Sequence, residues 1–180
     1  IERVYRPVGS GARTVFFINA DAADNYGVEL EARKGLGFLA SSLQQIVAFT
    51  NVTLMESQIH LGETEASATN TSRRMVGQAP YVINAGMTYT SRSSATSATL
   101  LFNRIGERID AAGDQPLPDV IVQPRSVLDF SLRFPLYASV SGRLDAKNLL
   151  DDKYETIQGT VVRESYQTGR VLQFGLTFRP

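Results

Sequence analysis

The 180-residue chain contains no cysteine, no tryptophan and only one histidine, His60. Without cysteine there is no disulfide framework, no thiolate catalysis and no thiolate metal site. One histidine excludes any site that needs two, and it excludes a Ser-His-Asp triad unless His60 serves it. The chain has 18 basic and 18 acidic residues, which argues against a nucleic-acid partner because such partners select a basic footprint. With no nucleophile–base or metal constellation visible, the sequence predicts a non-enzyme with no catalytic residue, metal site or cofactor.

Long apolar runs are also missing. No stretch approaches the roughly 18 apolar residues of a transmembrane helix. The first residues, "IERVYRPVGSG", resemble the end of a strand and a turn and lack the basic and apolar parts of a signal peptide. We therefore expect either that a leader has been removed or that the chain is the C-terminal piece of a longer protein.

Apolar and polar residues alternate along much of the chain, which is typical of strands with two unlike faces. In the stretch "YGVELEAR", Tyr26, Val28, Leu30 and Ala32 share one face and charged residues share the other. Strands are expected at residues 24–34, 43–57, 80–91, 95–106, 128–134, 138–148 and 170–178, with weaker ones at 13–20 and 1–6. The sequence thus predicts an all-β fold, an antiparallel meander of about eight long amphipathic strands. The segment "LASSLQQI" offers at most one turn of helix.

The expected connections alternate in length. Short turns are expected at residues 35–42, 92–94 and 135–137, and long polar loops at residues 60–79, 109–124 and 150–169. Two architectures fit such strands, a soluble β-sandwich and an outer-membrane barrel with its apolar face toward lipid. Several strands reach the 9–11 residues or so that cross a membrane, beyond the usual 5–6 of globular proteins. Strand length and the two unlike ends favour the barrel and leave the sandwich open.

The C-terminal residues carry a more specific pattern. "NLLDDKY", a polar loop and "YQTGRVLQFGLTF" supply Asn148, Leu149, Leu150, Asp151, Tyr154, Gly169, Arg170 and Phe178. This pattern resembles the C-terminus of TonB-dependent outer-membrane receptors, in which a Gly-Arg step opens a last strand that ends on an aromatic residue. Here Arg179 and Pro180 follow that aromatic residue.

Two further segments support the resemblance. "NADAADNYGVELEARKGL" is similar to a family segment with an Asn before a strand that carries Gly-Val-Glu-Leu-Glu. The matching residues here are Asn19, Gly27, Val28, Glu29, Leu30 and Glu31. "RRMVGQAPYVINAGMTY" looks like the family segment in which a loop ends at a proline and a strand follows. The three segments occur in the family's order along the chain.

The resemblance implies a fold, a location and a set of partners. Residues 1–180 would form the C-terminal portion of a transmembrane barrel that has 22 strands in the family, without the plug domain. The protein would lie in the bacterial outer membrane and import a scarce nutrient such as a ferric siderophore, cobalamin or a glycan. Its partners would be membrane lipid, the rest of the barrel and plug, TonB through that plug, and the barrel-assembly machinery. No nucleic acid is expected.

Several residues invite a functional interpretation and also have a simpler one. His60 precedes a long loop and fits either a metal-chelate ligand or a solvated loop histidine. Glu29 and Glu31 fit an acid/base pair, but one polar strand face favours wall charges paired with basic neighbours. "NADAADN" lacks the spaced acidic pattern of a calcium loop. The sequons at residues 51–53 and 70–72 are chance matches in a bacterial protein.

The two loops at residues 60–79 and 108–124 are the best candidates for ligand contact, because loops on a rigid scaffold carry recognition. Their polar residues are Glu63, Glu65, Asn70, Arg73, Arg74, Arg108, Asp110, Asp114 and Asp119. Neither loop shows clustered aromatic residues, so no ligand-binding site is assigned from the sequence. Two alternatives remain open: a self-contained eight-stranded barrel serving as an adhesin, structural protein or narrow channel, and a soluble β-sandwich binding module.

Overall fold

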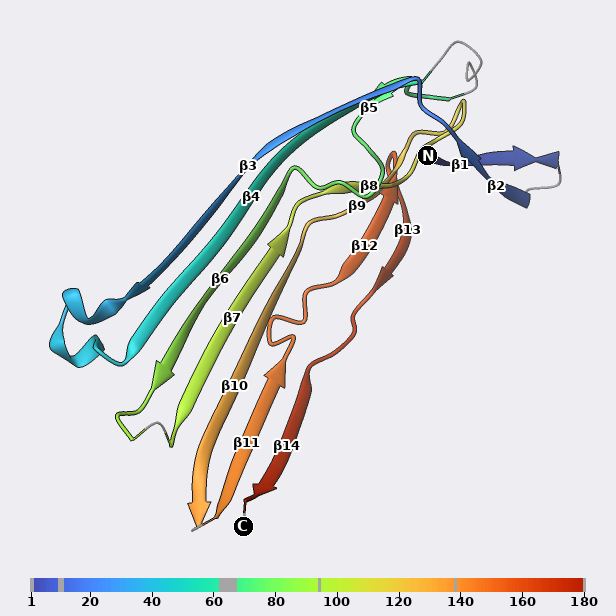
Figure 1. Ribbon diagram of the computed structural model, residues 1–180. Helices are drawn as coiled ribbons and strands as arrows, with labels where there is room; N and C mark the ends of the chain where they lie inside the picture. Colours follow the sequence, from blue (N-terminus) through green and yellow to red (C-terminus); the bar gives the residue numbers. More distant parts are fainter. Residues whose placement is uncertain (1, 10–11, 62–67, 94, 138, 180) are drawn as a thin grey trace.

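A computed structural model describes residues 2–9, 12–61, 68–93, 95–137 and 139–179. The protein is all-β, with antiparallel strands in three sheets (Figure 1). The helical elements described in full are two 3-10 turns, Leu36–Phe38 (η2) and Ser41–Leu43 (η3). The all-β class predicted from the alternation is therefore confirmed.

No helix among the described residues is long and apolar enough to cross a membrane.

The main sheet has eight strands, of which seven form a continuous path in the order β14-β11-β10-β7-β6-β4-β3, while β5 pairs with β4. In sequence order they are β3 (Ala22–Gly35), β4 (Ile46–His60), β5 (Ser72–Arg73), β6 (Tyr81–Thr90), β7 (Ser97–Ile105), β10 (Arg125–Tyr137), β11 (Val140–Lys147) and β14 (Val171–Phe178). Apart from β5, each strand lies beside its neighbours along the path in sequence order, so this sheet is the predicted meander.

The two ends of the main sheet differ. At one end, here called the turn end, residues 36–45, 91–96 and 138–139 make short connections. At the other end, the loop end, the connections are long and span residues 61–80, 106–124 and 148–170. The C-terminus lies at the turn end, and β1 and β2 lie toward the loop end (Figure 1).

The long connections contain more structure than the sequence predicts. Two of them hold β8 (Arg108–Ala111), β9 (Val120–Val122), β12 (Tyr154–Gln158) and β13 (Val161–Tyr166), which form a second sheet in the order β13-β12-β9-β8. A separate hairpin joins β1 (Glu2–Val8) to β2 (Ala12–Ile18). The long polar loops expected at residues 109–124 and 150–169 thus contain short strands, which pair with one another across the sequence. The described strands number fourteen, so the expected total of about eight holds only for the main sheet.

The short turn expected at residues 135–137 is also wrong. Strand β10 runs through Pro135 to Tyr137, with a register shift between these two residues opposite β11. A bulge is one of the few places where proline is tolerated in a sheet. The strand therefore passes the proline and continues to Tyr137.

The register of the main sheet brings apolar side chains from strand to strand onto one face. One row of Cα partners crosses six strands and consists of Ala48, Met87, Leu100, Phe130, Ala146 and Leu172. Successive side chains of a strand point to opposite faces, so the residues two positions away share this face. They include Leu30, Val52, Ile83, Leu132, Leu144 and Phe174. We call this side of the sheet the apolar face.

The neighbouring row belongs to the opposite side, the polar face. It crosses five strands and consists of Thr88, Thr99, Ser131, Asp145 and Gln173. Ser131 donates a hydrogen bond of 2.7 Å to Asp145 Oδ1, and the Thr88 and Thr99 hydroxyls lie 3.3 Å apart. On β4 this row continues to Val47, so the sorting by polarity is complete only from β6 to β14. Over those five strands a shift of one residue would exchange the two faces.

Most of the buried apolar residues lie at the loop end. Ile59, Leu61 and Ala68 form a buried cluster against which Ala20 and Met75 pack. Ala111 and Val122 are likewise buried within the second sheet, whereas Ala146 is the buried apolar residue of the main sheet's central band. The main sheet is thus a single layer. Each of its strands packs mainly against its hydrogen-bonded neighbours, and β4 also contacts η2.

The solvent-accessible area shows how much of this single-layer structure is exposed. The protein exposes 11370 Å². A globular chain of 19.7 kDa is expected to expose about 8,600 Å². Every residue of β3 and β14, the two edges of the path, is exposed, including Leu30 at 61% and Phe174 at 63%. The excess area is consistent with a sheet whose broad faces are left uncovered in the monomer.

Candidate functional site at the loop end

Backbone hydrogen bonds join the three long connections. Thr69 N–H donates to Gly113 O at 3.1 Å, and Gly77 N–H donates to Ile109 O at 2.8 Å. Gln123 N–H donates to Glu155 O, also at 2.8 Å, which brings in the third connection. Residues far apart in sequence therefore form one assembly at the loop end.

Asp119 lies at the centre of this assembly and is only 8% exposed. Its Oδ1 accepts a hydrogen bond of 2.7 Å from Gly113 N–H, and its Oδ2 accepts one of 2.8 Å from Asn70 Nδ2. A buried carboxylate is tolerated when its oxygens are satisfied in this way. Asp119 thus connects its own loop to the β4–β6 connection through Asn70.

The third connection joins beside Asp119. Gln158 Nε2 donates to Pro118 O at 2.7 Å, and Arg163 Nη1 donates to Gln158 Oε1 at 2.7 Å. Tyr154 and Tyr166 stack with ring centroids 5.0 Å apart across β12 and β13. Burial raises the pKa of the Tyr154 phenol, and the negative charge of Asp110 adds to this effect. The phenol therefore remains neutral in the stack at physiological pH.

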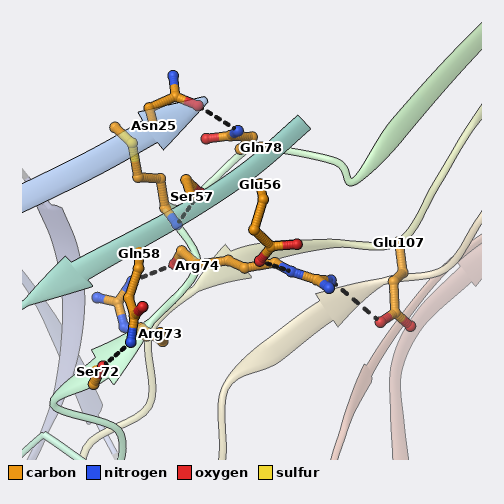
Figure 2. Close-up of polar contacts among 10 residues, drawn as sticks. Asn25, Glu56, Ser57, Gln58, Ser72, Arg73, Arg74, Gln78 and Glu107 are labelled. Carbon is orange, nitrogen blue, oxygen red and sulfur yellow. Dashed lines mark hydrogen bonds and ion pairs between the residues drawn. The ribbon is translucent and has the colours of Figure 1, made fainter. Parts of the chain in front are cut away.

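A second polar group lies where β4 meets the loop end (Figure 2). Arg74 Nε lies 3.3 Å from Glu56 Oε1, and Arg74 Nη1 lies 3.9 Å from Glu107 Oε1. These side chains are 40–57% exposed, so each pair contributes about 0–1 kcal/mol. Their role is to keep the β4–β6 connection near the start of the β7–β10 connection.

Uncharged contacts fix the same segment to β3 and β4 (Figure 2). Met75 N–H donates to Ser57 Oγ at 3.1 Å, and Gln78 Nε2 donates to Asn25 Oδ1 at 3.0 Å. Ser57 is almost fully buried, at 2% exposure. Asn25 and Ser57 are direct Cα partners, so the return of the chain toward β6 is held by hydrogen bonds from one face of the β3–β4 pair.

Several of the residues that the sequence predicts for ligand contact bind other residues of the protein. Asn70 and Asp119 bind each other, Arg74 binds Glu56, and Arg73 is buried with Nη1 donating to Arg74 O at 3.2 Å. Each of these side chains is therefore at least partly committed to contacts within the loop assembly. Sequence spacing gave no signal for the Asn70–Asp119 pair, whose members are 49 residues apart.

The remaining loop candidates are placed separately. Arg108 and Asp110 lie on β8, and Asp114 pairs with Ala68 through an isolated bridge. His60 is exposed at the last position of β4, opposite Ala22 and Ser72. Glu63 and Glu65 lie outside the described residues. In the described part of the chain, no three His, Cys, Asp or Glu residues are grouped so as to hold a metal ion.

The two halves of the C-terminal motif meet between β10, β11 and β14. Asn148 Nδ2 donates to Gly169 O at 2.7 Å, and Gly169 N–H donates to Asp151 Oδ1 at 3.0 Å. Arg170 Nε donates to Leu149 O at 2.8 Å. Asn148 has φ 55 and Asp151 has φ 51, a left-handed conformation that Asn and Asp adopt more readily than most residues. The residue types of the motif thus fit a tight clamp at the loop end.

The other motif residues lie on or before edge strands. Asn19 precedes β3, and residues 27–31 lie within it. Glu29 Oε1 accepts a hydrogen bond of 2.6 Å from Asn51 Nδ2 on β4, across the polar face. A Cβ atom added at Gly27 would come within 2.5 Å of Leu54 O, so only glycine fits there. Phe178 ends β14 opposite Val140, on the apolar face and 67% exposed.

No family model, curated protein or solved structure matches this chain.

Proposed function

We propose that the chain is part of a transmembrane β-barrel of the bacterial outer membrane, the C-terminal barrel portion of a TonB-dependent receptor. In this role the apolar face contacts lipid, the polar face lines the interior, and the loop end faces outward. The observation that carries the proposal is the register-matched sorting of apolar and polar rows over the single-layer main sheet. The receptor would import a scarce nutrient, and this chain would supply wall and outer loops.

The height of the apolar face supports a membrane setting. On β4 it extends from Ile46 to Leu54, and Glu56 follows on the same face at the loop end. Eight steps of about 3.3 Å, tilted by about 40°, span about 20 Å, close to the lipid-facing band of about 25 Å in outer-membrane barrels. Aromatic residues mark its ends, with Tyr26 and Tyr81 toward the loop end and Tyr89, Tyr137 and Phe178 toward the turn end.

Strand direction supports a barrel larger than this sheet. The continuous path has seven strands, so β3 and β14 run the same way, from the loop end to the turn end. Bacterial outer-membrane barrels are antiparallel and have an even number of strands. Closing this sheet with antiparallel neighbours at both edges therefore requires an odd number of further strands. One further strand would satisfy this parity, but β1 and β2 pair with each other, so the described strands supply no single strand for both open edges. Fifteen further strands also satisfy it and would give the 22 strands of a large receptor.

A soluble β-sandwich is disfavoured by a different observation. A sandwich packs two sheets face to face around a shared core. Here the second sheet extends the hairpins of the main sheet at the loop end (Figure 1), and the apolar face of β14 remains exposed. Leu172 and Leu176, at 74% and 63% exposure, would face water in a soluble monomer.

The intact mass of the native polypeptide extracted from its outer membrane tests the proposal. A mass several times 19.7 kDa, in the outer-membrane fraction, is expected for a receptor of this family. A native mass near 19.7 kDa with a heat-modifiable folded form would contradict the receptor and support a small barrel. Recovery in the soluble fraction without detergent would contradict both.

A further inference from the structure

The turn end of the main sheet is basic. Its strand ends and turns carry Arg33, Lys34, Arg92, Arg133, Arg143 and Arg179, and the segments 32–45, 88–97, 133–143 and 175–179 contain no Asp or Glu. Three of these arginines, Arg133, Arg143 and Arg179, come together on the polar face of β10, β11 and the end of β14. Nothing in the proposed function accounts for this concentration of one charge.

Arg133 and Arg143 are direct Cα partners in the β10–β11 pair. The Cβ atoms of such partners lie about 4.5–5.5 Å apart, and like charges in this position destabilise a sheet. Arg143 is neutralised within its own strand, because its Nε lies 2.8 Å from Asp145 Oδ2. The side chain of Arg133 forms no hydrogen bond or ion pair with another described residue. Its charge is therefore not compensated locally.

A hollow of about 340 Å³ lies beside Arg133. Its lining includes two basic residues, Arg133 and Arg179, and the hydroxyl-bearing residues Ser139, Ser141 and Thr177. Arg179 is held at its edge, since Arg179 N–H donates to Ser139 O at 3.0 Å. Every ionisable side chain that lines this hollow is positive, and its hydroxyl groups can donate hydrogen bonds.

The next hollow along the same two strands provides an internal contrast. It measures about 140 Å³ and is lined by two acidic and two basic residues, Asp129, Asp145, Arg143 and Lys147. Its charges balance within the protein, so it offers little attraction for an ion. The hollow at the turn end differs because no carboxylate of the described residues lines it beside its two arginines.

We propose that the hollow between β10, β11 and the end of β14 binds a phosphate group. Guanidinium groups match phosphate oxygens with two parallel N–H donors, so two arginines with no carboxylate of the described residues beside them suit an anionic phosphate. A bound phosphate would also compensate the charge of Arg133. The phosphate comes either from free phosphate in solution or from a phospholipid headgroup, and both present the same oxygens.

The test uses the full chain, folded in zwitterionic detergent for one arm and in phosphatidylcholine vesicles for the other. Inorganic phosphate is titrated calorimetrically at constant ionic strength in the first arm. In the second, phosphatidylglycerol is added to the vesicles and its contact with the protein is measured by ³¹P NMR. Saturable binding that Arg133→Gln weakens about tenfold, the loss of one charge-assisted contact, supports the proposal. If only the binding of inorganic phosphate depends on Arg133, the ligand is free phosphate. If only the contact with phosphatidylglycerol depends on it, the ligand is a lipid headgroup.

Arg92→Gln is the matched control, because it removes an equal charge from the same end of the sheet but outside the hollow. Its binding should equal that of the unaltered chain. Asp145→Asn frees the charge of Arg143 and should tighten binding severalfold. The proposal is overturned if neither arm shows binding that depends on Arg133, if Arg92→Gln weakens binding as much as Arg133→Gln, or if Asp145→Asn fails to tighten it. Circular dichroism confirms that each variant is folded.

Discussion

Asn148 and Gly169, 21 residues apart in the chain, are joined by a hydrogen bond of 2.7 Å from Asn148 Nδ2 to Gly169 O. The same amide group lies 3.1 Å from Thr168 Oγ1, and Asn148 N–H donates to Asp129 Oδ1 at 2.8 Å. One side chain thus holds the entry to β14 against the exit from β11, next to β10. This clamp starts the last strand in the register that keeps Leu172 and Phe174 on the apolar face.

Replacing Asn148 should loosen this clamp. Asn148→Ala removes the donors to Gly169 O and Thr168 Oγ1 and places alanine at φ 55, so unfolding free energy should fall by about 1–3 kcal/mol. Asn148→Gly tolerates the backbone conformation but also lacks the donors. The difference between the two variants in urea titrations of the detergent-folded protein isolates the backbone contribution. Equal stability of both variants and the unaltered chain would contradict the clamp.

Removing the Asp119 carboxylate should free the loop end without unfolding the main sheet. Asp119→Ala leaves Gly113 N–H and Asn70 Nδ2 without their acceptor, at a cost of about 1–3 kcal/mol to the loop assembly. Amide hydrogen exchange should accelerate in residues 68–79 and 108–122 and remain slow in β6 and β7.

Asp114→Asn is the control for this prediction, since the structure places Asp114 in the same loop with its backbone in the bridge to Ala68. Its exchange should match that of the unaltered chain. Acceleration of β6 and β7 together with the loops in Asp119→Ala would show that the loop end is not a separate unit.

The two faces of the main sheet should respond oppositely to an added charge. Leu100 and Thr99 are adjacent on β7 and belong to the apolar and polar rows. Leu100→Arg should destabilise the protein in phospholipid vesicles by about 2–4 kcal/mol, the cost of arginine at the lipid midplane. Thr99→Arg, directed toward Ser131 and Asp145, should cost far less. Denaturant unfolding in vesicles measures both, and an equal or reversed order would contradict the assignment of faces.

The ion pairs of Arg74 should stabilise the protein only at low salt concentration. Arg74→Ala removes contacts to Glu56 and Glu107 and should lower stability by about 1 kcal/mol or less, because these side chains are about half exposed. The difference should disappear near 1 M salt, where the screening length is about 3 Å. A loss that persists at high salt would mean that the aliphatic stem of Arg74 contributes packing instead.

Sequence periodicity predicted the strands of the main sheet and the two faces because alternation is local. It failed at Pro135, where a bulge carries the strand through a residue that usually ends one. It also failed for β8, β9, β12 and β13, which are short and are paired with strands distant in sequence, as in Val122 opposite Thr156. The contacts of Asp119 and the arginine cluster at the turn end were missed for the same reason, since both bring together residues that are distant in sequence.

The central claim is that the apolar face of the main sheet contacts lipid, and the absence of native cysteine allows a direct test. Single cysteines placed in turn at positions 128–133 of β10 would carry a spin label in the chain reconstituted into bilayers. The account predicts high accessibility to oxygen at Leu128, Phe130 and Leu132, and high accessibility to a water-soluble nickel chelate at Asp129, Ser131 and Arg133. Equal exposure of all six labels to the nickel chelate, with no alternation, would contradict it.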